Sequence, residues 1–529
     1  MKFPRLVPLA SSAFSVEFGG TLDAETNARV RALDRALALR PFDGFREAVP
    51  TLRSLLVLYD DSVVRPSAVA SELRARLGVE PLAPAAGRLH EVPTLYGGED
   101  GPDLAPLAKA LGMSEGDVVA LHAEREYTAF MLGFKPGFAY LGLVPEPLAC
   151  SRHETPRVRV PAGSVALAGR QTAVYPVSSP GGWQLVGRTS LSFFDPWREA
   201  PALVAPGDRV RFVRAHALPA PEPPLAPALA ASGSLAAVVR EPGFLTTVQD
   251  AGRVGRRRLG VGCAGAADGP SLAAANQAVG NAPEAAGLEC TVAGPLLEFV
   301  AATRFAVTGA DLGAVLERAD LGDWPVPRGA AVLARPGNRL RFDGLRSGCR
   351  AYIALEGGVD VAPVLGSRAT DLASGFGGQS GRALRAGDLV ALGRAGDRRH
   401  SHWSPATYAS TARVRVVLGP QDDHFDSEAT LRFLASCWRV GASSDRIGLR
   451  LAGEPLRHSG PAEILSDGML PGSIQVPPDG QPIVMLVDAP TTGGYPKIAT
   501  VLAADLPLLA QLVPGEGEVR FEAVSLDEL

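Results

Sequence analysis

Short apolar stretches separated by glycine and proline dominate residues 86–215 of the chain. They are Val158–Pro161, Ser164–Ala168, Thr172–Tyr175 and Trp183–Gly187, and a Pro-Gly-Asp turn at 206–208 precedes a further one at Val210–Val213. None is long enough for a helix. Strands this short, with turn residues between them, favour a closed or nearly closed β-barrel.

The flanking regions have a different character. Residues 1–85 alternate strand-like and helix-like segments, which predicts a small α+β domain. Leu89–Tyr96 either closes that domain or begins the next one. Residues 216–236 are rich in alanine and proline with almost no charge, as in a semi-rigid linker. Residues 237–529 look mostly β, with one helix at Pro270–Val279.

We therefore expect a mainly β chain with α+β character. Its predicted parts are an α+β domain (1–85), a barrel (86–215), a linker (216–236) and a second half (237–529) with two barrel lobes. A shared turn, Pro-Gly-Asp-Arg-Val at 206–210 and Ala-Gly-Asp-Leu-Val at 386–390, suggests that one barrel type recurs.

Charge and cysteine content exclude several classes of protein. A net charge of −4 and a pI of about 6.1 indicate neither a nucleic-acid nor an anionic-membrane partner. No run of 18 apolar residues predicts a membrane span, and the alternation Phe14-Val16-Phe18 fits a strand better than a signal peptide. Five dispersed cysteines without a CxxC pair fit a reducing compartment. We expect a cytoplasmic protein.

Lysine is scarce in this chain. Of 52 basic residues only Lys2, Lys109, Lys135 and Lys497 are lysines, a bias that a GC-rich genome would produce. A lysine that persists is one whose compact ammonium arginine cannot replace. Lys135 lies in Phe-Lys-Pro-Gly-Phe and Lys497 in Gly-Tyr-Pro-Lys-Ile. We predict that both bind an anion or transfer a proton.

Residues 157–189 combine neutral hydrogen-bonding side chains, arginines and glycines, although each taken singly is more often structural. Ser164, Gln171, Thr172 and Ser179 offer neutral hydrogen bonds, and Arg157, Arg159 and Arg188 can clamp a carboxylate or phosphate. No P-loop, HExxH or GxSxG motif occurs. His400 and His402 form the one close histidine pair, which we interpret as a solvated loop, and we predict no metal site.

The first half resembles the allophanate-hydrolase subunit 1 family, which includes a sporulation-kinase inhibitor and the B subunit of 5-oxoprolinase. The matching phrases are Pro-Arg-x-Arg-Val-Pro-Ala-Gly-Ser-Val, then Gly-x-Gln-Thr-x-Val-Tyr-Pro and Ser-Pro-Gly-Gly-Trp. The resemblance covers residues 4–214. Ala139 departs from it, since the family often has a proline there.

The second half is similar to the allophanate-hydrolase subunit 2 family, which includes the C subunit of 5-oxoprolinase. Its phrases include Thr-Val-Gln-Asp-Ala-Gly-Arg at 247–253, Ser-Asp-Arg-Ile-Gly-Leu-Arg at 444–450 and Thr-Thr-Gly-Gly-Tyr-Pro-Lys at 491–497. Coverage runs from about 238 to 523. Ala267 departs from the family's usual methionine.

The resemblance implies cyclophilin-like barrels and a fused B and C component of an ATP-dependent 5-oxoprolinase, which converts 5-oxo-L-proline to L-glutamate. It implies ATP, as Mg-ATP, a small-molecule substrate and a separate 5-oxoprolinase A subunit; self-association into a homo-oligomer is also compatible with the sequence. We expect the site between the halves. The predicted catalytic residues are Lys135, Lys497 and Asp445, and the predicted substrate-binding residues are Phe138, Arg157, Arg159, Ser164, Gln171, Thr172, Tyr175, Gly181, Gly182, Thr492 and Tyr495.

Two alternatives stay open at this point. One is a biotin-dependent carboxyltransferase of the urea carboxylase type, which would need a separate biotinylated partner because the chain has no biotin-attachment motif. The other is a non-catalytic regulator of a histidine kinase. For Asp250, Asp268, Asp311, Asp445, Asp467 and Asp488, which lie beside turn-forming residues, capping of backbone N–H groups competes with a catalytic role.

Overall fold

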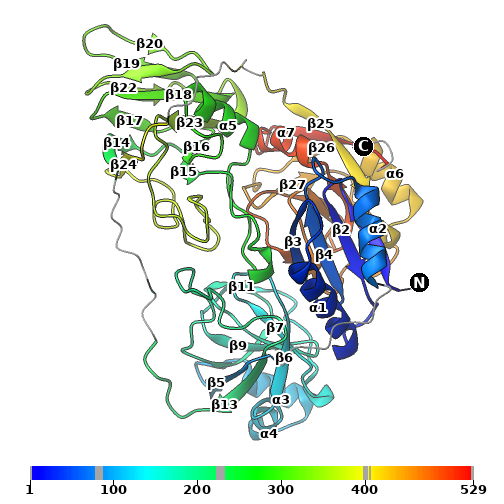
Figure 1. Ribbon diagram of the computed structural model, residues 1–529. Coiled ribbons are helices and arrows are strands. Elements are labelled where there is room, and N and C mark those ends of the chain that lie inside the picture. The colour runs from blue at the N-terminus through cyan, green and yellow to red at the C-terminus, as the bar shows by residue number, and fades with distance from the viewer. Residues whose placement is uncertain are drawn as a thin grey trace.

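The computed structural model describes residues 3–77, 87–221, 225, 233–396, 403 and 407–525. Residues 222–224 and 226–232 of the predicted linker and both His400 and His402 lie outside these residues. Four bodies follow one another along the chain: an α+β domain, a barrel, a two-sheet lobe and a second barrel (Figure 1). The mainly β fold class is confirmed.

The N-terminal domain is an antiparallel sheet covered on one face by two helices. The sheet order is β1 (Arg5–Leu9), β2 (Ala13–Glu17), β4 (Ser54–Tyr59), β3 (Phe45–Pro50), and the helices are α1 (Ala24–Leu39) and α2 (Pro66–Leu77). Asp23 caps α1 by accepting a hydrogen bond from the Thr26 N–H at 2.7 Å. Successive side chains of β2 point to opposite faces of the sheet. Phe14 and Val16 pack under the helices, whereas Ala13 points to the opposite side.

The first barrel closes with seven strands. Its order is β10 (Gln171–Val174), β7 (Ala139–Gly142), β6 (Glu126–Leu132), β13 (Arg209–Arg214), β5 (Leu89–Tyr96), β12 (Gln184–Arg188) and β9 (Ser164–Ala168). Leu89–Tyr96 therefore belongs to the barrel and pairs in parallel with its last strand. Outside the barrel lie α3 (Leu104–Leu111), α4 (Glu115–His122), η1 (Glu146–Leu148) and a two-stranded arm of β8 (Arg157–Val160) and β11 (Ser179–Gly181).

The two-sheet lobe is not a barrel, and this differs from the expectation of two barrel lobes in the second half. Its six-stranded sheet is β20 (Trp324–Pro325), β19 (Ala314–Glu317), β22 (Arg339–Phe342), β17 (Leu296–Phe299), β14 (Ser234–Glu241) and β24 (Leu389–Leu392). The five-stranded sheet is β15 (Leu245–Gln249), β16 (Gly287–Thr291), β23 (Ser347–Leu355), β18 (Thr303–Asp311) and β21 (Val332–Ala334). One apolar core lies between these open sheets. The lobe also carries η2 (Arg257–Leu259) and α5 (Gly269–Ala278).

The second barrel is again closed and seven-stranded. Its order is β25 (Thr411–Leu418), β32 (Lys497–Val501), β29 (Ser473–Gln475), β30 (Ile483–Met485), β27 (Gly448–Ala452), β26 (Trp438–Val440) and β33 (Glu518–Ala523). It has its own two-stranded arm, β28 (Asp467–Gly468) and β31 (Thr492–Gly493), besides η3 (Asp422–His424), α6 (Ser427–Ala435), η4 (Ala503–Asp505) and α7 (Leu506–Ala510).

The two barrels have the same topology. Numbered from first strand to last, the circular order is 5-3-2-7-1-6-4 in both, with the arm strands inserted after the third and fifth barrel strands. In both, the first and last strands pair in parallel. Connections that occupy equivalent positions in the two barrels can therefore be compared directly.

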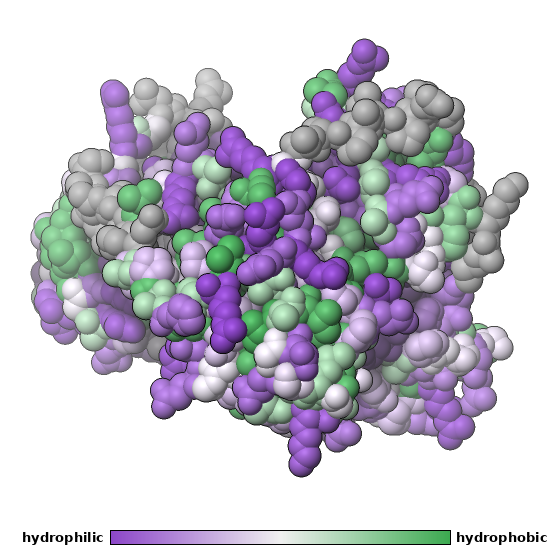
Figure 2. Space-filling view, turned by 90° about the horizontal axis from the view of Figure 1, so that it is seen from below, coloured by the Kyte–Doolittle hydropathy of each residue, from purple (hydrophilic) through white to green (hydrophobic). Residues whose placement is uncertain are grey.

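The surface seen from below is mostly hydrophilic, with small hydrophobic patches between the polar side chains (Figure 2). The large apolar side chains gather instead in interior clusters, one in each body. Within the described ranges, no helix is both long and apolar enough to cross a membrane.

Candidate functional site

The loop between β6 and β7 carries Lys135 to the junction of the two halves. The Gly137 N–H donates to the Leu259 carbonyl at 2.9 Å, and the Phe134 N–H donates to the Thr492 Oγ1 at 3.1 Å. A side chain at Gly260 would collide with the Lys135 carbonyl, so the second half approaches this loop as closely as glycine permits.

Lys135 faces an acid of the second half. Its Nζ donates to the Ala373 carbonyl at 3.4 Å. Burial lowers the pKa of Lys135, and the negative charge of Asp371 opposes that shift. Asp371 is itself buried and accepts a hydrogen bond from the Ser374 N–H at 2.9 Å. A lysine with a lowered pKa beside a carboxylate is suited to holding or moving a proton.

Arg253 is the next charged group along this junction. Its side chain is fully buried, donating from Nε to the Val364 carbonyl at 3.1 Å and from Nη2 to the Ala369 carbonyl. Its guanidinium lies 4.9 Å from the centre of the Phe376 ring, which in turn contacts Phe194 of the first half. Among the described residues, Nη1 of Arg253 has no hydrogen-bond partner. A buried guanidinium with a free donor is suited to an anion.

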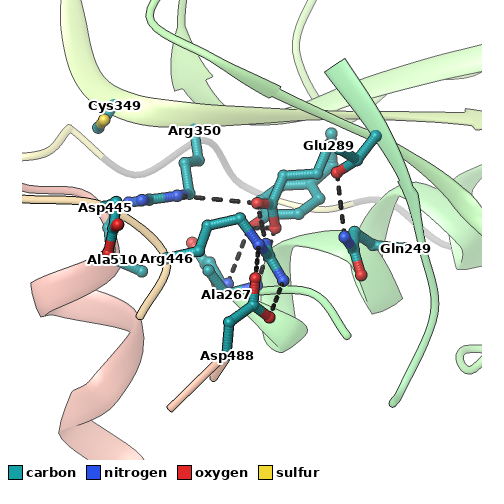
Figure 3. Close-up of polar contacts among 12 residues, drawn as sticks. Gln249, Ala267, Glu289, Cys349, Arg350, Asp445, Arg446, Asp488 and Ala510 are labelled. Atoms are coloured by element: carbon teal, nitrogen blue, oxygen red, sulfur yellow. Dashed lines mark hydrogen bonds and ion pairs between the residues drawn. The ribbon is translucent and has the colours of Figure 1, made fainter. Parts of the chain in front are cut away.

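Behind Arg253 lies a buried ion-pair network within the second half (Figure 3). Arg446 donates from Nε and Nη2 to the two carboxylate oxygens of Asp488, at 2.8 and 2.9 Å, and from Nη1 to Glu289. Burial raises the pKa of Asp488, with Arg446 opposing the shift. Burial would also raise the pKa of Glu289, but the Arg446 and Arg350 charges hold it below its usual value.

Charged groups of the two halves influence one another electrostatically across the junction. Asp371 interacts electrostatically with both Lys135 and Arg253, and Arg253 also interacts with Asp488. Such a series of interacting charged groups is suited to an anionic ligand at Lys135 and Arg253, with the buried groups behind them held in place by their ion pairs.

The predicted aromatic and barrel residues lie inside the first half. Phe138 and Tyr175 are both buried, with ring centroids 5.2 Å apart in one aromatic cluster. Thr172 Oγ1 lies 2.8 Å from Nε2 of the buried His122. Ser164 and Gln171 are buried in neighbouring strands, and the Gln171 Nε2 has no partner within the described part of the chain.

The predicted clamp residues Arg157, Arg159, Gly181 and Gly182 lie on or beside the arm β8–β11 of the first barrel. Arg157 donates to Asp103 at 2.6 Å, and Arg159 donates to the Ser178 hydroxyl at 3.1 Å. Neither partner belongs to the loop between β6 and β7, so these hydrogen bonds do not join the two arginines to the Lys135 loop.

The predicted residues of the second half do not gather in one place. Thr492 touches the Lys135 loop directly, and the carbonyl of the half-buried Tyr495 accepts a hydrogen bond from Gln475 at 3.4 Å. Lys497 is fully buried and pairs with Asp467 at 3.5 Å, beneath the N-terminal domain. Asp445 is exposed and caps its own turn by accepting from the Ile447 N–H at 2.8 Å.

Sequence reasoning missed Arg253, Asp371 and Arg446. Arg253 and Arg446 both stand in the quoted phrases, beside the aspartates that received attention instead. Asp371 had no signal of its own, because its partners Lys135 and Arg253 are remote in sequence.

Comparisons with known proteins agree with this division into halves. The model of the family described as "Carboxyltransferase domain, subdomain C and D" matches residues 4–204, and that of "Carboxyltransferase domain, subdomain A and B" matches residues 259–523. The chain belongs to the carboxyltransferase-domain family. Both matches include residues of the junction, Lys135 in the first and Asp371, Arg446 and Asp488 in the second.

Members of the carboxyltransferase-domain family resemble the chain either in one half or over its whole length. Residues of the second half are 40% identical to the C subunit of 5-oxoprolinase from Escherichia coli over 286 residues, 54% of this chain and 90% of the relative. Residues of the first half are 42% identical to the B subunit of 5-oxoprolinase from Bacillus subtilis over 217 residues, 39% of this chain and 90% of the relative.

Two further matches are a much longer protein, similar to about half of this chain, and a solved structure that spans both halves. Urea amidolyase of Lachancea kluyveri is 32% identical over 315 residues, 54% of this chain but 17% of the relative. The crystal structure of TTHA0988 superposes with a TM-score of 0.85 at 36% identity, covering 97% of this chain and 100% of that one.

Proposed function

We propose that this chain is the cytoplasmic, fused B and C component of an ATP-dependent 5-oxoprolinase, and that a separate A subunit is needed to complete the enzyme. The reaction opens the lactam ring of 5-oxo-L-proline to give L-glutamate, with hydrolysis of ATP. Two observations support the proposal. Each half is similar to one 5-oxoprolinase subunit over 90% of that relative's length. The observation that carries most weight is that the Lys135 Nζ of one half donates to the Ala373 carbonyl of the other, where the negative charge of Asp371 also acts on the lysine.

The residues at the junction fit an anionic ligand. Arg253 has a free buried donor and Lys135 makes a single long hydrogen bond, so both have capacity for a carboxylate or phosphoryl oxygen. Among the described residues, no group of three or more side chains gathers in a way suited to a metal ion. The role that we assign to this chain is binding of the anion.

Lys135 and Arg253 have separate roles in this proposal. An amide resists attack by water, and ATP supplies the phosphoryl group that turns the lactam oxygen into a leaving group. Arg253 binds and orients the anion, since its other donors are fixed to backbone carbonyls. Lys135 holds or moves a proton, because burial lowers its pKa while the negative charge of Asp371 opposes that shift.

The deciding experiment measures ATP-dependent glutamate release from 5-oxoproline, by the chain alone and with a candidate A subunit. We expect activity in the mixture only. Lys135→Met and Arg253→Lys should each lower kcat about a hundredfold or more, whereas Lys109→Met on the exposed face of α3 should leave it unchanged. Absence of glutamate release from the mixture would contradict the proposal.

A biotin-dependent carboxyltransferase is the second candidate, and the family itself favours it. Urea amidolyase and a urea carboxylase structure, at 30% identity and a TM-score of 0.52, are similar to about half of this chain. Carboxylated biotin would supply a carboxyl group, and Arg253 and Lys135 would bind that anion. Co-purification with a biotinylated protein, in cells that make no 5-oxoproline-dependent glutamate, would favour this candidate over the first.

A further inference from the structure

The arm of the second barrel is covered by the N-terminal domain. Figure 1 shows this domain, in blue, beside the last barrel, in yellow to red, although the two lie at opposite ends of the chain. A side chain at Gly468 of β28 would collide with Leu56 of β4. Next to it, Leu470 packs with Leu9, Ala13 and Val49. The face of the N-terminal sheet opposite its helices is thus buried by the second half.

A charged pair lies under this apolar contact. Lys497 is fully buried, with Nζ 3.5 Å from the Asp467 Oδ2. Asp467 also accepts from the Ser54 hydroxyl of the N-terminal domain and, at 3.2 Å, from the Gln421 Nε2. Glu17 of β2 is fully buried and adds a second negative charge near Lys497. The ammonium therefore faces one acid from each half.

The equivalent arm of the first barrel is not covered in this way. It occupies the same position in an identical topology, yet Val158 on β8 is 89% exposed. An arm at this position does not need to be buried for its barrel to close. The burial of β28 comes from the contact with the N-terminal domain, whereas Thr492 of β31 contacts the Lys135 loop.

We infer that the arm β28–β31, together with Lys497, is a protein-recognition surface whose partner is the N-terminal domain of the first half. The two halves then hold together without the linker. Lys497 is a positioning residue that seats one half on the other, and it does not touch the anion site at Lys135. This inference does not depend on which reaction the site performs.

Cutting the full-length chain tests the inference. A protease site placed between residues 221 and 233 allows the purified, folded protein to be cut, after which gel filtration and native mass spectrometry report on association. We expect both fragments to stay together on dilution to micromolar concentration. Fragments that separate on cutting would overturn the inference.

Variants then test the role of Lys497. Lys497→Met leaves Asp467 buried without its paired cation, whereas Glu17 keeps its ion pair with Arg5. The cut halves should then separate about a hundredfold faster or more. Lys497→Met combined with Asp467→Asn removes the charge of both partners and should recover much of that loss, which general damage to the barrel would not.

Milder and neutral variants complete the test. Ser54→Ala deletes only the hydroxyl that reaches Asp467 from the N-terminal domain, and should speed separation about tenfold. If Lys497→Met does not fold, Ser54→Ala still tests the contact between the two halves. Lys109→Met, on the exposed face of α3, is the control. Separation rates for Ser54→Ala and Lys497→Met equal to that of Lys109→Met would refute the assigned role.

Discussion

Two lysines that looked alike in the sequence have different surroundings. Both Lys135 and Lys497 stand in glycine- and aromatic-rich loops of an arginine-rich chain; Lys497 pairs with Asp467, whereas Lys135 donates to the Ala373 carbonyl. Scarcity of lysine correctly marked them as unusual, because burial beside an acid favours a compact ammonium. Lys135 interacts with Ala373, and Lys497 with Glu17 as well as Asp467, so groups remote in sequence that no local pattern encodes contribute to both environments.

Asp445 and Arg446 are adjacent, and the prediction selected the exposed one of the two. The aspartate was expected to be catalytic, since a carboxylate between turn residues attracts attention, yet it is exposed and caps its own turn. The next residue, Arg446, is buried between Asp488 and Glu289. Both residues precede β27, in a segment without regular strand structure, so no alternation of side-chain direction predicts which of them points inward.

His122 predicts a pH dependence of stability. Its ring nitrogens lie 2.8 Å from the Tyr96 hydroxyl and 2.8 Å from the Thr172 hydroxyl, and burial lowers its pKa to about 3. The unfolded chain binds a proton near pH 6.5, whereas the folded chain does not until near pH 3. The contribution of His122 to stability is therefore complete above pH 6.5 and is lost as the pH falls toward 3.

Between these limits, His122 removes about 1.4 kcal/mol of unfolding free energy per pH unit. His122→Gln, which keeps both hydrogen-bonding capacities without titrating, should lack this slope. Urea unfolding at pH 6.5 and pH 4.5 measures the difference. Parallel pH profiles for the two proteins would show that His122 is protonated in the folded state.

At the scale of elements, the duplicated barrel was only partly visible in the sequence. The turn at 206–210 was matched with 386–390, but the latter leads into β24 of the open lobe. The structural counterpart of β13 is β33, and the two share Val-Arg-Phe after a Pro-Gly turn. One extra residue between turn and strand hides this match from a comparison of short phrases.

The loop that follows β23 predicts a contrast between two glycines. Gly375 and Gly377 have nearly the same left-handed backbone, with φ of 74° and 75°. An added Cβ meets nothing within 4 Å at Gly375, but at Gly377 it collides with the Ala369 carbonyl and the Arg253 guanidinium. Both substitutions to alanine therefore incur the same backbone strain, and only one displaces Arg253.

Gly375→Ala should lower the unfolding free energy by about 1–2 kcal/mol and leave turnover largely intact. Gly377→Ala should lower it further and also impair turnover, because Arg253 loses its place. Thermal unfolding and a turnover assay of the complete enzyme measure both. Equal effects of the two variants would show that the loop relaxes and that Arg253 is not held by it.

At the scale of the whole molecule, the two halves share apolar cores as well as charges. Phe194 of the first half packs with Val261, Val364 and Phe376 of the second in one cluster. Arg257 and Arg258 of the second half pair with Glu47 and Asp34 of the N-terminal domain. The sequence predicted the fold class and the division into halves, but not these contacts, because each joins segments remote in the chain.

Such shared cores predict a single cooperative unfolding transition. Because the halves bury common surface, neither should unfold while the other stays native, in contrast to domains joined only by a linker. Differential scanning calorimetry should give one peak whose van't Hoff and calorimetric enthalpies agree. Two separated transitions would show that the halves are energetically independent.

The contact between Ser54 and Asp467 joins residues 413 positions apart. At a synthesis rate of about 5–20 residues per second, the ribosome needs roughly 20–80 s to make the second partner after the first. During that time the sheet face formed by Leu9, Ala13, Val49 and Leu56 has no cover. The nascent first half therefore exposes an apolar surface, so its yield in the cell should depend on chaperones that shield it until translation ends.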